Sequence, residues 1–516
     1  MNEANINTGG IEEGDMFFGL FKKSEKAEMV IKGGKIYTFD PDEPVVEAVA
    51  CKDGNIMAVG EEDDIEDLIG SETEIIDLEG SVLLPGFIET CGHPVLQAFK
   101  KVCLILDDHM SQEGVLEVLA EHIKENPEKD AYFAYGFNTS FVAKKPTEET
   151  QKLLDQICDD KPVVLLDISG FEGWFNTKAM EQVKQAFAEE AEGKEPEEMP
   201  VITLSYVLHV LSPIDFEQLR ASVISLAAEY CQEGVTTIFD CGAPDYLHAI
   251  YQEMILEMLQ TDMLKQRFRG SLLIARNIPC DYIIGKLLQK RTTCAEINEF
   301  INCNVLKLII EDQDDMRDDA IKTSEKLLKN LAVRASDQGF DIHIDTIGKK
   351  SIAKAFELTA IARASGSRKT HFTIAHTDEL SPEELSGMKE DKELCEVAST
   401  VGDIDKKCAY FDCATDVKGA IERLTIDAAV ELGVSDSFGS IEVGKKADFV
   451  AYEKNPFEDT LEKFSRATAL MTIIGGRVVY DQRIDRPEEW HEMLKSKQKE
   501  MDDQMLEEDD FDDDEF

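Results

Sequence analysis

The stretch Leu83–Phe99 reads LLPGFIETCGHPVLQAF: an apolar run passes through Pro85-Gly86 and stops at a polar cluster. This pattern predicts a buried β-strand whose carboxyl end carries side chains able to do chemistry. Cys91 and His93 are two residues apart, so in an extended segment both side chains lie on one face, as ligands of one metal ion would. The alternative is an ordinary strand end with a histidine in a turn.

Downstream of this strand, apolar strand-like runs alternate with amphipathic helices. The runs are PVVLLDIS (162–169), VTTIFDCG (235–242), VLKLIIED (305–312), FDIHIDTIG (340–348) and HFTIAHTD (371–378). Repeated strand, helix and strand predict a parallel sheet, because parallel strands need long crossover connections. We therefore expect an α/β fold of the TIM-like (β/α) barrel type.

Both ends of the chain have a different texture. Short β-rich runs separated by glycine turns fill residues 27–84, and the pattern returns in GSIEVGKKADFVAYEKNP (439–456) and TALMTIIGGRVVYD (468–481). Both ends are therefore expected to form one small β-sandwich domain. The predicted division is an N-terminal extension (1–26), the sandwich (27–84 and 436–482), the barrel (85–435), and a C-terminal helix with an acidic tail (483–516).

Composition narrows the classes of partner. The 516-residue chain has a formal charge of -51, which repels phosphate backbones and anionic headgroups and so disfavours nucleic-acid and membrane partners. The tail Asp502–Phe516 is mostly acidic, which predicts disorder and either a solubilising or a partner-binding role. Twelve cysteines without a Cys-x-x-Cys motif predict free thiols and a cytoplasmic location.

Three further clusters stand where barrel strands end. Lys307 lies within an apolar strand, His343 and Asp345 share one strand face, and His376 ends the next strand. Each has an ordinary explanation, such as a paired lysine or a hydrogen-bonded core histidine. Together with His93 they occupy the same position in one repeating pattern, which favours a common site at the carboxyl rim of the barrel.

With these residues in view, the chain resembles the amidohydrolase superfamily, in the family 3 subgroup of N-substituted formamide deformylase-like, metal-dependent hydrolases. The resemblance covers about residues 27–482. It rests on the order of LPGFIE (84–89), YGFN (135–138), GWFNTKAM (173–180), EGVTTIFDCG (233–242) and GSIEVGKKADFVAYEKNP (439–456).

The resemblance implies a centre of one or two divalent ions, expected to be zinc, and hydrolysis of a carbon–nitrogen bond in a small amide-type substrate. The implied metal ligands are Cys91, His93, Lys307, Asp345 and His376. Cys91 and Asp345 stand where the family has histidines, and Lys307 where it often has a carbamylated lysine. The resemblance also implies substrate contacts by Trp174 and Asn176, Asp412 as a remnant of the proton-shuttling aspartate, and allows a homo-oligomer.

The sequence also departs from the family pattern. Phe171 replaces a histidine of the second strand, and only about forty residues separate His376 from the terminal helix AIERLTIDAAVELG (420–433). The barrel is therefore expected to be incomplete around strands 7 and 8. Two hypotheses follow: a metal-dependent hydrolase with an altered site, or a catalytically inactive protein that keeps the fold for binding or as a scaffold.

Overall fold

The computed structural model of the chain describes residues 25–484 with internal gaps. The gaps are residues 108–109, 139–147, 168–172, 193–203, 212–214, 243–253, 259, 262, 275–278, 298, 312–324, 366–369, 378–379, 381–395 and 398–415. Within the described part, no helix is long and apolar enough to cross a bilayer. The predicted acidic tail lies outside the described residues.

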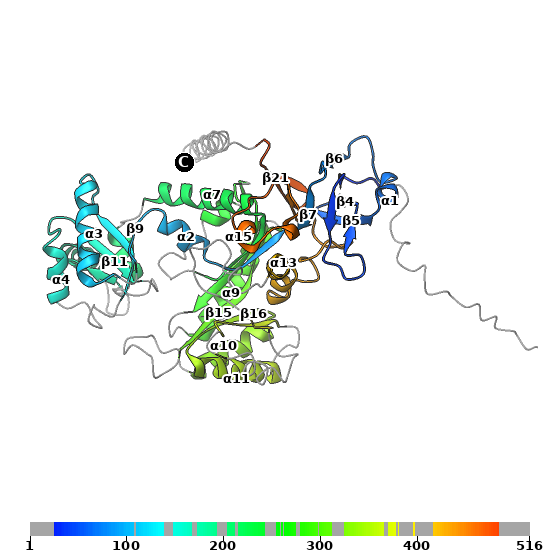
Figure 1. Cartoon of the computed structure of the whole chain (residues 1–516). Coiled ribbons are helices and arrows are strands. Elements are labelled where there is room, and N and C mark those ends of the chain that lie inside the picture. The colour runs from blue at the N-terminus through cyan, green and yellow to red at the C-terminus, as the bar shows by residue number, and fades with distance from the viewer. Residues whose placement is uncertain are drawn as a thin grey trace, which may run out of the picture.

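Two sheets are built from the chain ends (Figure 1). One has the order β5-β4-β1-β6, from β1 (Met29–Lys32), β4 (Ala48–Lys52), β5 (Asn55–Gly60) and β6 (Glu74–Asp77). The other has the order β21-β20-β19-β7-β2-β3, from β2 (Lys35–Tyr37), β3 (Val45–Val46), β7 (Val82–Pro85), β19 (Phe449–Tyr452), β20 (Met471–Ile474) and β21 (Arg477–Asp481). Apolar side chains of both sheets, including Ile31, Leu83 and Phe449, form one buried cluster. The two chain ends thus meet in one sheet, and the sandwich arrangement stays a prediction.

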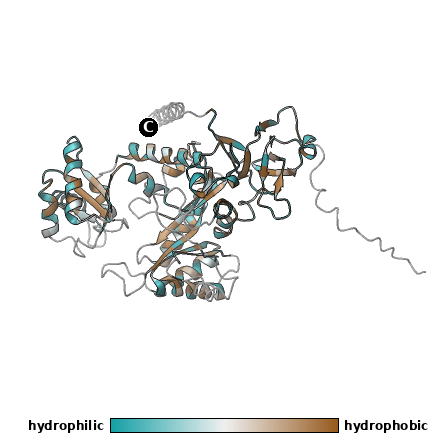
Figure 2. Ribbon diagram, in the orientation of Figure 1, coloured by the Kyte–Doolittle hydropathy of each residue, from teal (hydrophilic) through white to brown (hydrophobic). Residues whose placement is uncertain are grey.

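The centre of the molecule is an α/β unit with a curled sheet of parallel strands, in the order β18-β17-β16-β15-β14-β13-β8. Its strands are β8 (Phe87–Gly92), β13 (Val235–Asp240), β14 (Arg267–Ile274), β15 (Ile301–Glu311), β16 (Asp341–Ile347), β17 (Phe372–Ala375) and β18 (Glu396–Val397). Its crossover helices include α7 (Phe216–Glu233), α9 (Cys280–Ile297), α10 (Glu325–Asp337) and α11 (Lys349–Ser365). Figure 2 shows the apolar colour of these strands against the two-sided colouring of the helices. Among the described residues β18 and β8 do not pair, so a closed barrel stays a prediction.

A helical segment bridges the open side of this sheet. It consists of α13 (Val417–Glu422), the π-helical turn η3 (Arg423–Asp427) and α14 (Ala428–Glu431). Ala428 and Leu432 pack with Ile88 of β8 and Val305 of β15 in a buried cluster. The carbonyl of Glu431 accepts two hydrogen bonds from residues at the start of β17. The donors are His371 Nε2 (2.7 Å) and Thr373 Oγ1 (2.8 Å). The segment therefore connects β8 to β17 across the side where the sheet is unpaired.

One strand assignment from the sequence is wrong. The run PVVLLDIS forms β11 (Val163–Asp167), which belongs to a separate sheet with β9 (Leu104–Ile105), β10 (Tyr132–Phe137) and β12 (Gly173–Phe175). With α3 (Gln112–Glu125), α4 (Glu148–Asp155) and α5 (Thr177–Ala191), this sheet makes a lobe of its own (Figure 1), which shares a buried apolar cluster with β14 and β15. β8 pairs directly with β13 instead. An apolar run reports that a strand is buried, and it does not report which strand lies beside it.

Candidate functional site

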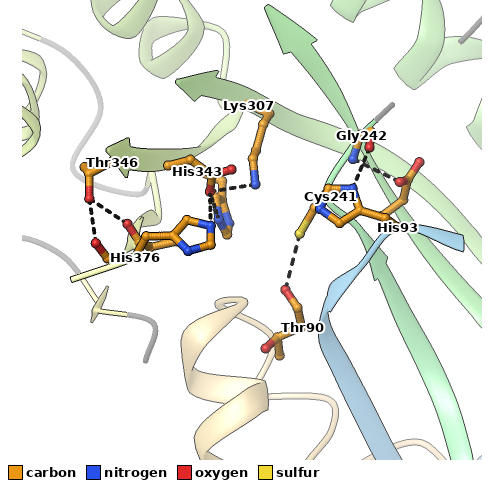
Figure 3. Close-up of polar contacts among 11 residues, drawn as sticks. Thr90, His93, Cys241, Gly242, Lys307, His343, Thr346 and His376 are labelled. Carbon is orange, nitrogen blue, oxygen red and sulfur yellow. Dashed lines mark hydrogen bonds and ion pairs between the residues drawn. The ribbon is translucent and has the colours of Figure 1, made fainter. Parts of the chain in front are cut away.

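The side chain of Asp345 is the centre of the candidate site. Figure 3 shows Lys307, His343 and His376, whose side chains point toward one another. The Oδ1 of Asp345 lies 2.8 Å from Lys307 Nζ and 3.3 Å from His343 Nε2. The ring of His376 reaches the same oxygen at 3.8 Å. The register explains this convergence, because Lys307 of β15 pairs with His343 of β16, and Asp345 pairs with Ala375, the residue before His376. Three neighbouring parallel strands thus direct their polar side chains at one carboxylate oxygen.

The electrostatic balance at Asp345 is set by this surrounding group. Burial by itself raises the pKa of the Asp345 carboxyl, but the charge of Lys307 and the nearby imidazoles outweigh burial and hold that pKa well below its usual range. Despite the short distances, Asp345 Oδ1 and His343 Nε2 make no hydrogen bond of good geometry among the described residues. The carboxylate is therefore charged, and its Oδ1 is held mainly by the ion pair with Lys307.

His343 is the most enclosed imidazole of the group. Its side chain is buried and its ring stacks on Phe239 of β13 with centroids 5.2 Å apart. Burial, together with the charge of Lys307, lowers the pKa of His343 to about 4. This ring is therefore neutral at neutral pH and able to offer a nitrogen lone pair.

His93 lies at the carboxyl end of β8, separated from the other histidines in Figure 3. It is the residue before α2 (Pro94–Lys100), and its Nδ1 is 2.8 Å from the carbonyl of Gly242. A carbonyl accepts, so Nδ1 carries the proton and Nε2 is left with the lone pair. Burial, with the charge of Lys307, lowers the pKa of His93 to about 4, which keeps the ring in its metal-binding neutral form.

His376 has a strained backbone, with φ at +61° in the left-handed region that residues other than glycine rarely adopt. The hydroxyl of Thr346 holds this turn by donating to the carbonyls of Ala375 (2.8 Å) and His376 (3.1 Å). This turn places the half-exposed ring, labelled in Figure 3, with its Nε2 3.8 Å from Asp345 Oδ1. Strain of this kind is found where a side chain must be held in one direction.

Comparison with known proteins settles the class of this fold. The sequence pattern of the amidohydrolase family matches residues 74–398 and 406–480. The chain belongs to the amidohydrolase family. The resemblance predicted from the motifs is therefore confirmed.

Three relatives show how this amidohydrolase is similar to known proteins. Exoenzymes regulatory protein AepA of Pectobacterium carotovorum is 28% identical over 165 residues, which cover 31% of this chain and 36% of that protein. The N-substituted formamide deformylase of Arthrobacter pascens is 25% identical over 162 residues, 31% of this chain and 30% of that protein. Protein LONG AFTER FAR-RED 3 of Arabidopsis thaliana is 20% identical over 540 residues, 88% of this chain and 92% of that protein. The chain thus matches about a third of the length of the first two and nearly all of the third.

Solved structures are similar in fold. An uncharacterised metal-dependent hydrolase from Pyrococcus horikoshii aligns with a TM-score of 0.57 and 15% identity, over 84% of this chain and 99% of that chain. An adenosine deaminase from Xanthomonas campestris with bound zinc aligns with a TM-score of 0.52 and 14% identity, over 92% of this chain and 99% of that chain. At such low identity the likeness shows the amidohydrolase-type fold alone.

The two residues that were expected to contact substrate, Trp174 and Asn176, are buried and hydrogen-bonded within the lobe. Trp174 is fully buried in the lobe, and its Nε1 donates to the carbonyl of Thr150 (2.9 Å). Asn176 is also fully buried; its Oδ1 accepts from Val163 N and Ala179 N, and its Nδ2 donates to the carbonyls of Cys158 and Lys161. Neither side chain presents a free polar atom or a surface to a substrate.

The remaining predicted site residues are placed in part. Cys91 lies in β8, but its side chain is not described, and Asp412 and Phe171 lie outside the described residues. Sequence reasoning missed Glu431, whose carboxyl group is hydrogen-bonded with Thr90 of β8 and lies near the charge of Lys307. Its helix AIERLTIDAAVELG has an ordinary amphipathic pattern, so no sequence signal marks this carboxylate.

The side chains around Asp345 are of types that bind a divalent ion, but the distances between them do not enclose one. Neutral imidazoles and an ionised carboxylate are common zinc ligands, and the buried Oδ1 of Asp345 lacks a well-aligned donor. However, among the described residues no three His, Cys, Asp or Glu side chains lie close enough to enclose an ion. The ammonium group of Lys307 also lies beside Asp345 and adds positive charge where a cation would bind. Metal binding at these residues therefore requires Lys307 to lose its charge.

Proposed function

We propose that this amidohydrolase is a metal-dependent hydrolase that cleaves a carbon–nitrogen bond, other than a peptide bond, in a small amide-type substrate. The observation that supports this most is the convergence of Lys307, Asp345 and His376 from adjacent parallel strands, with His93 on the strand at the far edge. Family membership and the similarity to a formamide deformylase support the same class of reaction.

His93, Asp345 and His376 are the proposed ligands of a divalent ion, with Cys91 as a further candidate. The neutral ring of His93 can offer a lone pair, the ring of His376 lies beside Asp345, and the Asp345 carboxylate supplies negative charge. When bound, such an ion polarises a substrate carbonyl and lowers the pKa of water. Zinc is the ion we propose, because nitrogen and sulfur donors suit it.

Lys307 is proposed to join the ligands after carbamylation. Addition of carbon dioxide to its neutral amine forms an N–C bond, releases a proton, and replaces a cation with an anionic oxygen donor. Carbamylation would thus remove the positive charge that Lys307 places beside Asp345. Asp412, the proposed proton carrier, lies outside the described residues.

A second function is favoured by one observation. The Lys307–Asp345 ion pair already neutralises the central carboxylate, at 2.8 Å. If this pair persists, the protein is a catalytically inactive amidohydrolase that binds a partner or ligand. A cytoplasmic location and a homo-oligomer stay predictions under either function.

Metal content per chain separates the two functions. We expect about one zinc or similar ion per full-length chain purified without chelators. A chain with both His93→Ala and His376→Ala should lose it, whereas a chain with His122→Ala and His209→Ala, outside the site, should keep it. Circular dichroism on each variant checks that the fold is retained.

Turnover is tested on the same proteins with formamides, linear amides and cyclic ureas. Ion-dependent release of amine that disappears in the His93/His376 variant supports the hydrolase. Absence of stoichiometric metal after loading with zinc, manganese or iron(II), with bicarbonate present, contradicts it and leaves the binding function.

A further inference from the structure

Helix α9 and strand β15 bring two thiols together away from the candidate metal site. Cys294 on α9 and Cys303 on β15 are 2% and 8% exposed, lie in the same buried cluster, and their thiols interact electrostatically. Lys290, one helical turn before Cys294, is also buried in this interface. A lysine is costly to bury, so its presence beside two thiols calls for a chemical reason.

A local irregularity of the sheet creates this contact. The register between β14 and β15 shifts between Arg269 and Ser271, where the partner residues advance from Asn302 to Val305. This bulge changes the side-chain alternation, so Cys303 joins the core beneath α9 while Val305 joins the cluster inside the curled sheet. Gly270 faces the thiol, and a Cβ there would lie 2.6 Å from Cys303 Sγ. The backbone is therefore shaped to admit a sulfur atom at this position.

The two thiols differ in acidity in the way that a nucleophile and its partner do. The interaction with the Cys303 thiol, aided by the charge of Lys290, lowers the pKa of Cys294 despite its burial. The same interaction and burial raise the pKa of Cys303 well above its usual range. For comparison, burial raises the pKa of Cys51, in β4, to about 12. Cys294 is thus the thiol with more thiolate character, and Cys303 is the proton donor.

We propose that Cys294 and Cys303 form a peroxide-sensitive pair that closes into an intramolecular disulfide. The Cys294 thiolate attacks hydrogen peroxide; an S–O bond forms, the O–O bond breaks, and the departing hydroxide takes a proton to become water. The sulfur of Cys303 then displaces the hydroxyl group of the Cys294 sulfenic acid. The S–S bond forms, the S–O bond breaks, and the thiol proton leaves with the hydroxyl group as a second water.

The disulfide would link α9 to β15 four residues before Lys307. Lys290 acts as a positioning residue, because its ammonium group stabilises the attacking thiolate without reacting. This modification does not depend on the proposed hydrolase activity. It can be tested on the full chain whether or not a metal binds.

The sequence makes the test direct, because both cysteines fall in one tryptic peptide, TTCAEINEFINCNVLK (292–307). The full-length protein is treated with hydrogen peroxide, its remaining thiols are alkylated under denaturing conditions, and peptides are weighed. We expect this peptide to lose two hydrogen atoms and to take up no alkylating group until a reductant is added. The peptide with Cys51, IYTFDPDEPVVEAVACK (36–52), should stay fully alkylated.

Variants identify the roles. Cys303→Ser should arrest the reaction at the Cys294 sulfenic acid, trapped by dimedone. Lys290→Met should slow disulfide formation about threefold or more, while Lys286→Met, exposed one turn earlier on α9, should leave the rate unchanged. A peptide that keeps both thiols at peroxide doses that oxidise the exposed methionines overturns the proposal. So does preferential pairing of either residue with another cysteine.

Discussion

At the scale of single residues, Glu431 combines burial with an unsatisfied oxygen. One carboxyl oxygen is hydrogen-bonded with Thr90, and Oε1 is buried with no hydrogen-bond partner in the described part of the chain. Burial, with the charge of Glu89, raises the pKa of Glu431 to about 8 against the opposing effects of Thr90 and Lys307. Between the usual pKa and about 8 the folded state keeps a proton that the unfolded chain releases. The free energy of unfolding should therefore fall as pH rises through this window.

Replacing Glu431 by Gln removes the titration and keeps the shape. We expect Glu431→Gln to be more stable than wild type above about pH 8 by roughly 2 kcal/mol, with little difference near about pH 5. Urea denaturation across this range measures the effect. Glu296→Gln, an exposed carboxylate on α9, is the control. Parallel pH profiles for wild type and Glu431→Gln would refute the buried-acid assignment.

The Lys307–Asp345 pair gives a second prediction at this scale. Lys307→Met leaves a largely buried carboxylate without its nearest cation and should lower the free energy of unfolding by about 3 kcal/mol in metal-free protein. Adding Asp345→Asn to the same chain removes the stranded charge and should restore part of the loss. Urea denaturation of both variants is the measurement. A double variant as unstable as the sum of the singles would show that the two side chains do not interact.

The residue scale also shows what the sequence could predict of the site. Period-two alternation and strand ends located Lys307, Asp345 and His376, which do lie together. The sequence could not predict that Lys307 pairs directly with Asp345. A strand pattern shows which face of the sheet a side chain lies on, and it does not show the distance between two side chains. Glu431 escaped prediction because it approaches from a helix far along the chain. The metal-binding role of these residues stays a prediction.

At the scale of elements, Asn176 joins a helix to a strand. Its Oδ1 caps α5 by accepting from Ala179 N and also accepts from Val163 N at the start of β11. Asn176→Ala should lower the free energy of unfolding by about 2 kcal/mol, because it removes a helix cap and leaves buried backbone groups without partners. Ser111→Ala, which removes an exposed cap with one hydrogen bond on α3, should cost about 1 kcal/mol. Thermal unfolding compares the two, and equal losses would contradict the bridging role.

The sequence predicted the individual strands better than it predicted which strands pair with one another. The four runs predicted near 235–242, 305–312, 340–348 and 371–378 correspond to β13, β15, β16 and β17 of the curled sheet. The strand β14 was not predicted: its sequence RFRGSLLI places Arg267 and Arg269 where an apolar run was sought. These arginines are paired with Asp448 and Asp341, so a buried strand can carry charge when tertiary partners neutralise it. Such partners are invisible in a local sequence window.

At the scale of the whole molecule, a buried ion pair is one of the contacts between the sheet of the chain ends and the curled sheet. Arg267 of β14 donates to Asp448, next to β19, through Nε (2.7 Å) and Nη2 (3.0 Å), and the two side chains are 6% and 4% exposed. Gly475 N donates to the same carboxylate (2.7 Å), and the guanidinium lies 4.4 Å from the ring centroid of Phe300. The sequence predicted that both ends meet, and it gave no sign of this contact with the centre.

This geometry predicts that Arg267→Met strongly lowers the free energy of unfolding. The substitution leaves Asp448 charged, buried and with fewer donors, which should lower the free energy of unfolding by about 3 to 5 kcal/mol. Because the pair connects two sheets, the sheet of the chain ends should then unfold at lower urea than the curled sheet, giving two transitions instead of one. Arg334→Met, which breaks an exposed pair with Asp281, should change the free energy of unfolding little and keep one transition. Urea denaturation monitored by hydrogen exchange reports on the stability of each sheet separately. Equal behaviour of the two variants would mean that the buried pair does not couple the chain ends to the centre.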